Sequence, residues 1–272
     1  MFAVKSVFEF MLIIFSISII GYFIDFMKKN DRVNKVSFYL LCLVWFVQTI
    51  ILYYVTFVKN IFPVLTLHDG LFFYAWILIL FSLLLNWFFR VHFIILFTNV
   101  ISFLTLLLAL MLNAMTTFDV QSVQFVHEIL IIHIIFTIVS YGFFTLSFAL
   151  SSMYLVQYYF LKRKKGFRWM WRFTDLHKLD ELSFLFTIIG VPLLFIGIIF
   201  GVVWAYFAQA EFYWFDFKTI GSILVLMIYI VALLLRFFNG YSGRPTSVYN
   251  AIAFSALLIN FFLFSSLSSF HF

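Results

Sequence analysis

The segment Ser183–Lys218, SFLFTIIGVPLLFIGIIFGVVWAYFAQAEFYWFDFK, joins a long apolar stretch to a dense run of aromatic residues. The apolar part exceeds the roughly 20 residues that a helix needs to cross a bilayer. In the second part, residues 201–218, only Glu211, Asp216 and Lys218 are charged. Aromatic side chains concentrate at the membrane–water interface. The segment therefore predicts a membrane-spanning helix followed by a loop at one face of the membrane.

The rest of the chain has the same membrane character. Of its 272 residues, 65% are hydrophobic and only 10% are charged, against roughly 25% charged residues in soluble domains. Alternating ten-residue strands are absent, so helices are expected to satisfy the backbone groups in lipid. The prediction is an all-α, multi-pass protein of the cell membrane, a single integral domain over residues 1–272. Its eight spans are expected at 7–27, 37–58, 70–89, 91–112, 127–160, 182–207, 218–238 and 247–270.

The basic residues predict the orientation of these spans. All but three of the 17 Lys and Arg lie in or beside the loops after the first, third, fifth and seventh spans, the exceptions being Lys5, Lys59 and Lys218. The positive-inside rule makes these loops cytoplasmic and places both termini outside. Because the basic residues set the orientation, the net charge of +6 indicates no nucleic-acid partner. The apolar run after Lys5 lacks a small-residue cleavage site and is expected to be a retained first helix.

The largest predicted cytoplasmic loop, residues 161–181, mixes basic and aromatic side chains. Arg168, Trp169, Trp171 and Arg172 lie at its centre. One interpretation is binding to anionic lipid headgroups, which attract each basic residue by about 1 kcal/mol. The other is a docking surface for a cytoplasmic protein, since Trp and Arg are frequent anchors of interfaces. The two interpretations are compatible.

Histidines and buried amides are the remaining candidates for polar roles. His127 and His133 are six residues apart, about 600° on a helix, so they point to different faces and form no joint metal site. A single histidine at the outer face is either a polar cap or an axial haem ligand. The histidines assigned to that face are His68, His127, His133 and His271. Four amide residues in or near spans are expected to hydrogen-bond across helices: Gln48, Asn86, Asn99 and Gln157.

No motif of the chain indicates catalysis. It contains no phosphate-binding loop, hydrolase triad or zinc-ligand spacing. Glu211 and Asp216 at a wet surface are weak grounds for acid–base chemistry. The single cysteine, Cys42, lies within an apolar stretch and has no partner for a disulfide within the chain. The prediction is a protein that is not an enzyme.

Three stretches, in order along the chain, resemble motifs of the cytochrome c assembly family of haem-handling membrane proteins. Residues 201–218 resemble the tryptophan-rich pattern GAVWANEAWGSYWSWDPKE without gaps. Residues 61–76, IFPVLTLHDGLFFYAW, resemble FPLSNLYESLMFLSW, and residues 133–141, HIIFTIVSY, resemble HVSMMLLSY. The identities to the first pattern are Gly201, Val203, Trp204, Ala205, Ala208, Asp216 and Lys218.

The resemblance implies a site for haem b at the outer face. His133 aligns with a histidine that the family uses as an axial ligand, and His271, His127 or His68 would supply the other axial position. The expected metal ligands are His133 and His271. The residues that would line the macrocycle are Trp204, Tyr213, Trp214, Phe215 and Asp216.

Departures from the family pattern indicate a divergent branch. The central tryptophan of the pattern is Gln209 here, and two further family histidines fall on Leu234 and Ser268. The size, the eight spans and the opening FEFMLIIFSISIIGYFIDF resemble the HemX-type proteins of Gram-positive bacteria. This resemblance implies a regulator that lowers the level of glutamyl-tRNA reductase, the first committed enzyme of haem synthesis. The alternatives are a haem transporter or chaperone for cytochrome c assembly, and a structural partner in an assembly complex that binds no ligand.

Overall fold

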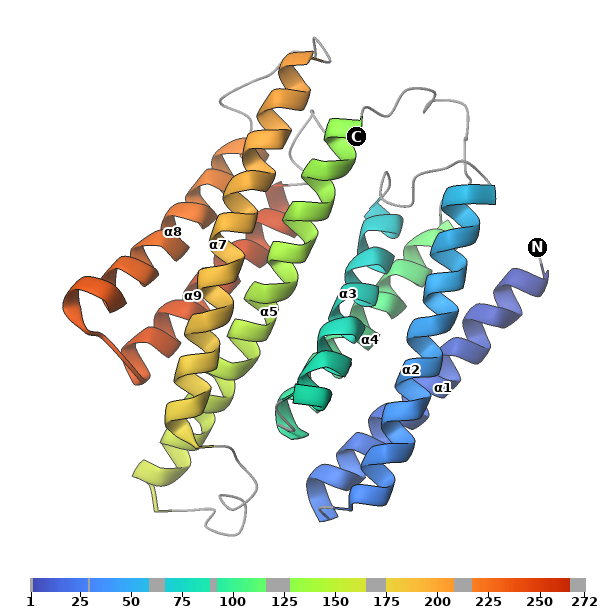
Figure 1. Ribbon diagram of the computed structural model, residues 1–272, viewed down its shortest axis with the longest axis horizontal. Helices are drawn as coiled ribbons and strands as arrows, with labels where there is room; N and C mark the ends of the chain where they lie inside the picture. Colours follow the sequence, from blue (N-terminus) through green and yellow to red (C-terminus); the bar gives the residue numbers. More distant parts are fainter. Residues whose placement is uncertain are drawn as a thin grey trace. The chain divides into compact units, whose positions relative to one another are not determined.

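The computed structural model describes residues 2–28, 30–58, 67–88, 92–115, 128–164, 175–207 and 217–264, and every regular element among them is helical (Figure 1). Eight helices are long and apolar enough to cross a membrane. The predicted all-α membrane protein is therefore confirmed, while its orientation and its single domain stay predictions. The helices are α1 (Phe2–Lys28), α2 (Asp31–Tyr53, continued by the π-helical turn Tyr54–Val58), α3 (Leu67–Phe88), α4 (His92–Met115), α5 (Glu128–Lys162), α7 (Leu176–Phe207), α8 (Phe217–Asn239) and α9 (Arg244–Ile259, continued by the π-helical turn Asn260–Phe264).

Helix α7 begins earlier than the predicted span at 182. It starts at Leu176, and the Asp175 side chain accepts a hydrogen bond from the backbone N–H of His177 at 3.3 Å. This is the contact of a helix N-cap, which satisfies one of the unpaired N–H groups of the first turn. The start of α7 therefore incorporates Asp180 and Glu181, which the sequence assigned to the cytoplasmic loop.

Contacts group the chain into two compact units, Met1–Val120 and Gln121–Phe272, called unit 1 and unit 2 below. Unit 1 contains α1–α4, coloured blue to teal in Figure 1, and unit 2 contains α5–α9, coloured green to red. In unit 1, α1 packs on α2 and α4, and α3 packs on the same two helices. The four helices therefore surround a common interior. Ser18 Oγ ties α1 to α2 by donating to the carbonyl of Ser37 at 2.9 Å.

The α5–α7 pair is the most extensive helix contact in unit 2. Two hydroxyls on α5 donate to carbonyls on α7: Ser140 Oγ to Gly190 at 2.9 Å and Ser147 Oγ to Ser183 at 2.7 Å. From one bond to the next, both helices move by seven residues in opposite directions. This is the repeat of an antiparallel coiled-coil seam, built here from the small residues that allow close helix contact in membranes.

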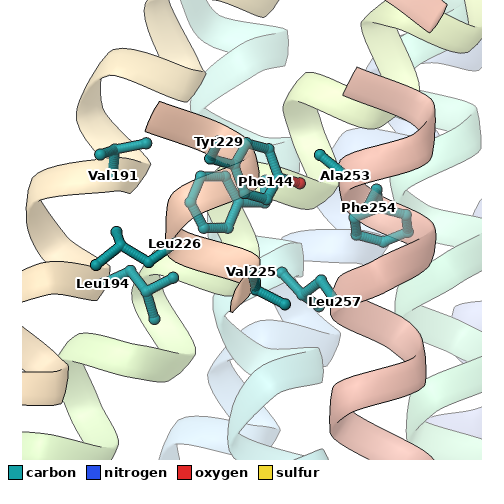
Figure 2. Packing of buried hydrophobic residues seen from close by; sticks show 9 residues of the cluster. All are labelled: Phe144, Val191, Leu194, Val225, Leu226, Tyr229, Ala253, Phe254 and Leu257. Carbon is teal, nitrogen blue, oxygen red and sulfur yellow. The ribbon is translucent and has the colours of Figure 1, made fainter. Parts of the chain in front are cut away.

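A buried apolar cluster joins α5, α7, α8 and α9 (Figure 2). At its centre the rings of Phe144 and Tyr229 stack with centroids 3.8 Å apart and an interplanar angle of 8°. Both side chains are fully buried. The surrounding members are Val191, Leu194, Val225, Leu226, Ala253, Phe254 and Leu257. The cluster fixes the two C-terminal helices against the α5–α7 pair.

One of the four predicted amide contacts is confirmed. Asn86 Nδ2 donates across helices to Tyr22 Oη at 3.2 Å. The prediction is wrong for Gln48 and Asn99, because none of their buried amide atoms has a hydrogen-bond partner in the part of the chain that the structure describes. Gln157 Oε1 is also buried without one. Helical periodicity can place an amide on a buried face, but it does not supply a partner opposite.

A larger residue at Gly190 is expected to destabilise the α5–α7 pair. A Cβ atom at this position would lie 2.6 Å from Phe144 Cε1, and that ring is held in its stack on Tyr229. Overpacking of this kind costs about 1–3 kcal/mol, so Gly190→Val should lower the Tm of the detergent-purified protein by several degrees. Gly70→Ala is the matched control, since nothing lies within 4 Å of a Cβ there. An equal Tm for both variants would contradict the close packing.

Candidate functional site

His133 is held by the backbone of α7. Its Nδ1 lies 2.6 Å from the carbonyl oxygen of Gly197. A carbonyl only accepts, so Nδ1 carries a proton, and in the neutral ring the lone pair is therefore on Nε2. A backbone carbonyl that fixes one ring nitrogen in this way is the usual second contact of a metal-ligating histidine. The ring is therefore held in the tautomer that a ligand through Nε2 requires.

Gly201 allows this position of the imidazole. A Cβ atom on Gly201 would lie 2.8 Å from both Nδ1 and Cε1 of His133. Gly201 is the first residue of the aromatic segment, and Trp204 follows one turn later, half-buried, in the last turns of α7. Two of the sequence-predicted haem residues, His133 and Trp204, are thus brought to neighbouring turns of the α5–α7 pair. The exposed rings of Tyr206 and Phe207 end the helix.

His68 lies in unit 1, at the start of α3. Its Nδ1 is 3.0 Å from Asp69 Oδ1, and its side chain is 12% exposed. The other predicted haem residues, His127, Tyr213, Trp214, Phe215, Asp216 and His271, lie outside the described residues. Within the described part of the chain, no group of three or more His, Cys, Asp or Glu residues could hold a metal ion.

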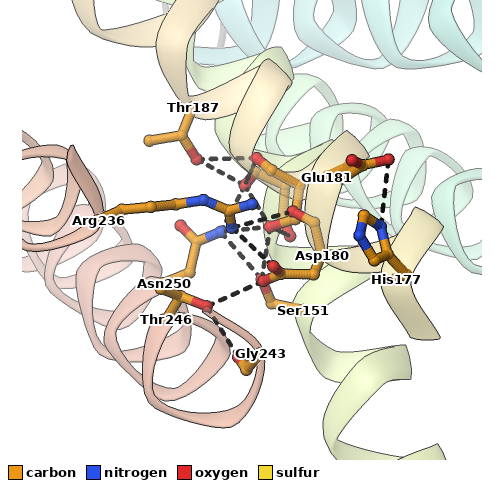
Figure 3. A network of polar contacts seen from close by, with 11 residues as sticks. Ser151, His177, Asp180, Glu181, Thr187, Arg236, Gly243, Thr246 and Asn250 are labelled. Carbon is orange, nitrogen blue, oxygen red and sulfur yellow. Dashed lines mark hydrogen bonds and ion pairs between the residues drawn. The ribbon is translucent and has the colours of Figure 1, made fainter. Parts of the chain in front are cut away.

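A buried ion pair joins three helices of unit 2 (Figure 3). Arg236 of α8 donates to Asp180 Oδ2 of α7 at 2.8 Å, and Thr246 of α9 donates to Oδ1 at 2.9 Å. The guanidinium also covers the ring of Phe184 at 4.1 Å from its centroid. Both carboxylate oxygens are thereby satisfied. Asp180, Arg236 and Thr246, called the Asp180 cluster below, connect the first turns of α7 to the last turn of α8 and the first turn of α9.

A second polar group lies further inside unit 2. It consists of Ser147 and Ser151 of α5, Ser183 and Thr187 of α7, and Asn250 of α9, all buried. Asn250 Nδ2 is within hydrogen-bond distance of three hydroxyls, those of Ser147, Ser151 (2.9 Å) and Ser183 (2.8 Å) (Figure 3). In lipid the hydrophobic effect does not drive helices together, so hydrogen bonds of this kind help to stabilise their association. The group is a structural connection between α9 and the α5–α7 seam.

Known proteins identify the family. Residues 64–271 match the cytochrome c assembly protein family. The chain belongs to this family. It is 42% identical to the protein HemX of Bacillus subtilis (strain 168), over 96% of this chain and 94% of that protein. It is 34% identical to the protein HemX of Brevibacillus brevis over 98% of both, and 27% identical to the cytochrome c biogenesis protein CcsA of Chlamydomonas reinhardtii over 71% of this chain and 55% of that protein.

The family match and the two kinds of relative divide the chain. The match begins at residue 64, so α1 and α2 precede it. The HemX proteins are similar over nearly the whole chain, α1 and α2 included, whereas the CcsA relative covers 71% of it. With its eight apolar helices, the chain is therefore a multi-pass membrane protein of the cytochrome c assembly family. His133 and Gly201 both lie in the matched region.

The sequence did not reveal the Asp180 cluster. Asp180 lies among charged residues that predict a solvated loop, and Arg236 is assigned to setting the orientation of the spans in the membrane. The available hint was the cap at Asp175, which starts a helix before these charges. The predicted docking residues Arg168, Trp169, Trp171 and Arg172 lie outside the described residues, between α5 and α7.

Proposed function

We propose that this chain is a membrane regulator of haem biosynthesis that lowers the level of glutamyl-tRNA reductase and has no catalytic activity of its own. The observation that carries the proposal is the 42% identity to HemX over 96% of the chain, because the resemblance that implies this regulation is to HemX-type proteins. Residues 165–174 are the proposed contact with the reductase. Two helices flank this segment in the sequence. Helix α5 ends at Lys162, and the Asp180 cluster fixes the first turns of α7.

Replacing the anchors of this segment together is expected to abolish the control. In cells that carry only the variant Trp169→Ala/Trp171→Ala/Arg172→Ala, the reductase should rise to the amount found without the protein, as measured by quantitative immunoblot. The reason is that aromatic and Arg anchors contribute most of the energy of a protein interface. Membrane fractionation checks that the variant is inserted.

A matched variant separates protein docking from lipid binding. Lys162, Arg163 and Lys164 end the described part before this segment, and Arg163 covers the ring of Tyr159 at 4.4 Å. Replacing all three by alanine removes about 3 kcal/mol of headgroup attraction, more than the loss of Arg172 alone. Docking predicts normal reductase control in this variant. Loss of control here and normal control in the anchor variant would contradict the proposed contact.

A haem carrier is the second candidate, and one observation favours it. His133 Nδ1 donates to the Gly197 carbonyl, so that Nε2 is the nitrogen suited to an axial bond, and Trp204 lies one turn beyond Gly201. Haem b bound through His133 and against Trp204, Tyr213, Trp214, Phe215 and Asp216 would be moved or shielded at the outer face. His271 or His127 would complete the ligation. Such a site is compatible with regulation, since a regulator that binds haem would respond to it directly.

A further inference from the structure

The interior of unit 1 contains an unusual number of buried polar atoms without a hydrogen-bond partner. Gln48, Ser82, Thr98 and Asn99 are all 0% exposed. A buried polar group left unpaired costs about 1–3 kcal/mol, so a group of this size requires a partner. Among the described residues of unit 1 the atoms are Trp45 Nε1, both amide atoms of Gln48, His68 Nε2, Ser82 Oγ, Thr98 Oγ1 and both amide atoms of Asn99.

These side chains lie on the inward faces of three helices. Gln48 continues the buried stripe Ser37, Leu41, Val44 of α2 at helical spacing. On α3, Ser82 belongs to the stripe of Leu71, Ala75, Leu78 and Leu85, and His68 lies one turn before Leu71 on the same face. On α4, Asn99 lies one turn from the buried residues Ile95 and Ser102. The polar atoms therefore face the common interior of the four helices.

Two hydrogen bonds set the relative levels of the helices. Trp76 Nε1 of α3 donates to Thr49 Oγ1 of α2 at 2.8 Å, and Ser102 Oγ of α4 donates to the carbonyl of Ala75 at 2.9 Å. Gln48 is therefore level with Ser102. Asn99 lies three residues away along α4, a displacement of about 4.5 Å.

The remaining atoms extend the row along the axis of the bundle. Thr98 directly precedes Asn99 in α4, one residue further from Ser102. Ser82 is seven residues from Ala75 in one direction and His68 is seven residues from it in the other, each a displacement of about 10 Å. The unpaired atoms thus occupy about 20 Å of the interior. Beyond Ser82 the row ends at Tyr22, which is 1% exposed and accepts a hydrogen bond from Asn86 at 3.2 Å.

The chemistry of the row identifies its ligand. Amide N–H groups and the indole N–H donate, amide oxygens accept, and hydroxyls do both. A bound anion would select donors and a bound cation would select oxygen acceptors, whereas this set is mixed. Water donates and accepts, and buried waters usually make about three hydrogen bonds to polar groups that lack other partners. A row that extends along the axis also fits several small molecules better than one compact ligand.

We propose that unit 1 encloses a row of bound water molecules, held by Gln48, Asn99, Thr98 and Ser82. The row is entered beside His68, at the end of the bundle where α2 ends and α3 begins, and is closed by Tyr22 and Asn86. Unit 1 is thus a hydrated half-channel, and its polar axis lies on α2, α3 and α4, none of which contains the aromatic segment of residues 201–218. The inference does not depend on the regulatory function.

Cysteine reactivity tests the proposal. A thiol reacts as the thiolate, which forms in water but not in a dry apolar core. The background variant is Cys42→Ser, which removes the only native cysteine. Ser82→Cys and Thr98→Cys are each added to this background, and the proteins are reconstituted into nanodiscs. They are then treated with a small water-soluble methanethiosulfonate. Both should react at least tenfold faster than Val225→Cys, a 1% exposed position in the apolar cluster of unit 2. Equal rates at all three positions would overturn the proposal.

A second comparison guards against reaction through loose packing. Adding Gln48→Leu and Asn99→Leu removes the amides that hold the water, so the rate at Thr98→Cys should fall at least tenfold. Gln48→Leu as a single substitution should also lower the Tm relative to the native protein, because the water bound to Asn99 loses one of its hydrogen-bond partners. An unchanged rate in the first variant, or a raised Tm in the second, would mean that the interior is dry and would overturn the inference.

Discussion

Asp180→Leu is expected to lower the Tm of the purified protein by well over five degrees. The substitution leaves the partly buried Arg236, whose side chain is 17% exposed, without the carboxylate that accepts its 2.8 Å hydrogen bond. Removing one partner of a buried ion pair costs about 3 kcal/mol or more, because the other charge stays uncompensated. Thr246 also loses its acceptor on Asp180 Oδ1. Thermal unfolding in detergent, followed by circular dichroism, measures the loss.

A double substitution separates the unpaired charge from the lost contact. Asp180→Leu/Arg236→Met removes both charges, and apolar replacement of a whole buried pair is often neutral. Most of the lost stability should therefore return, which is a coupling that independent sites would not show. Glu181→Gln is the single control, since the Glu181 side chain is 59% exposed and pairs with the exposed His177 ring at 3.3 Å. Equal losses for Asp180→Leu and Glu181→Gln would contradict the role of the cluster.

His133→Ala is expected to abolish or shift the haem spectrum of the purified protein, if haem is its ligand. After reconstitution with haem b, the native protein should show a Soret band and sharp reduced bands, and the variant should lose them, because an axial ligand sets the spin and binding of the iron. His177→Ala is the control: its ring is 74% exposed and pairs with Glu181. Oxidised and reduced absorption spectra of all three proteins make the measurement.

The outcome also decides how regulation would work. Loss of the bands in His133→Ala alone means that the family's haem site persists and that the regulator reads haem directly. A native protein without any Soret band after reconstitution contradicts haem binding. In that case the aromatic segment is an inherited scaffold, and reductase control depends on residues 165–174 alone.

Much of the fold follows from the sequence because lipid imposes a simple rule. A stretch of about 20 apolar residues in a membrane must be helical, since only a helix satisfies its backbone without water. The eight spans therefore appear close to their predicted positions. Two helices start six residues before their predicted spans, each behind a side-chain cap: α2 starts at Asp31 after Asn30, and α7 starts at Leu176 after Asp175, although charged residues follow. Charge alone marked those residues as loop, and a local capping contact with a buried ion pair made them helix.

The membrane class, the number of spans and the family can be predicted from the sequence, since these depend on the length of apolar runs and on motifs such as residues 201–218. Tertiary structure alone decided which side chains meet. In the folded chain His133 is hydrogen-bonded to the Gly197 carbonyl, and Asp180 is paired with Arg236 and Thr246. Among the described residues, Gln48 and Asn99 have no hydrogen-bond partner. The physical reason is that hydrophobicity acts without direction along the chain, whereas a hydrogen bond or ion pair requires a partner within about 3 Å that only the packing of separate helices supplies.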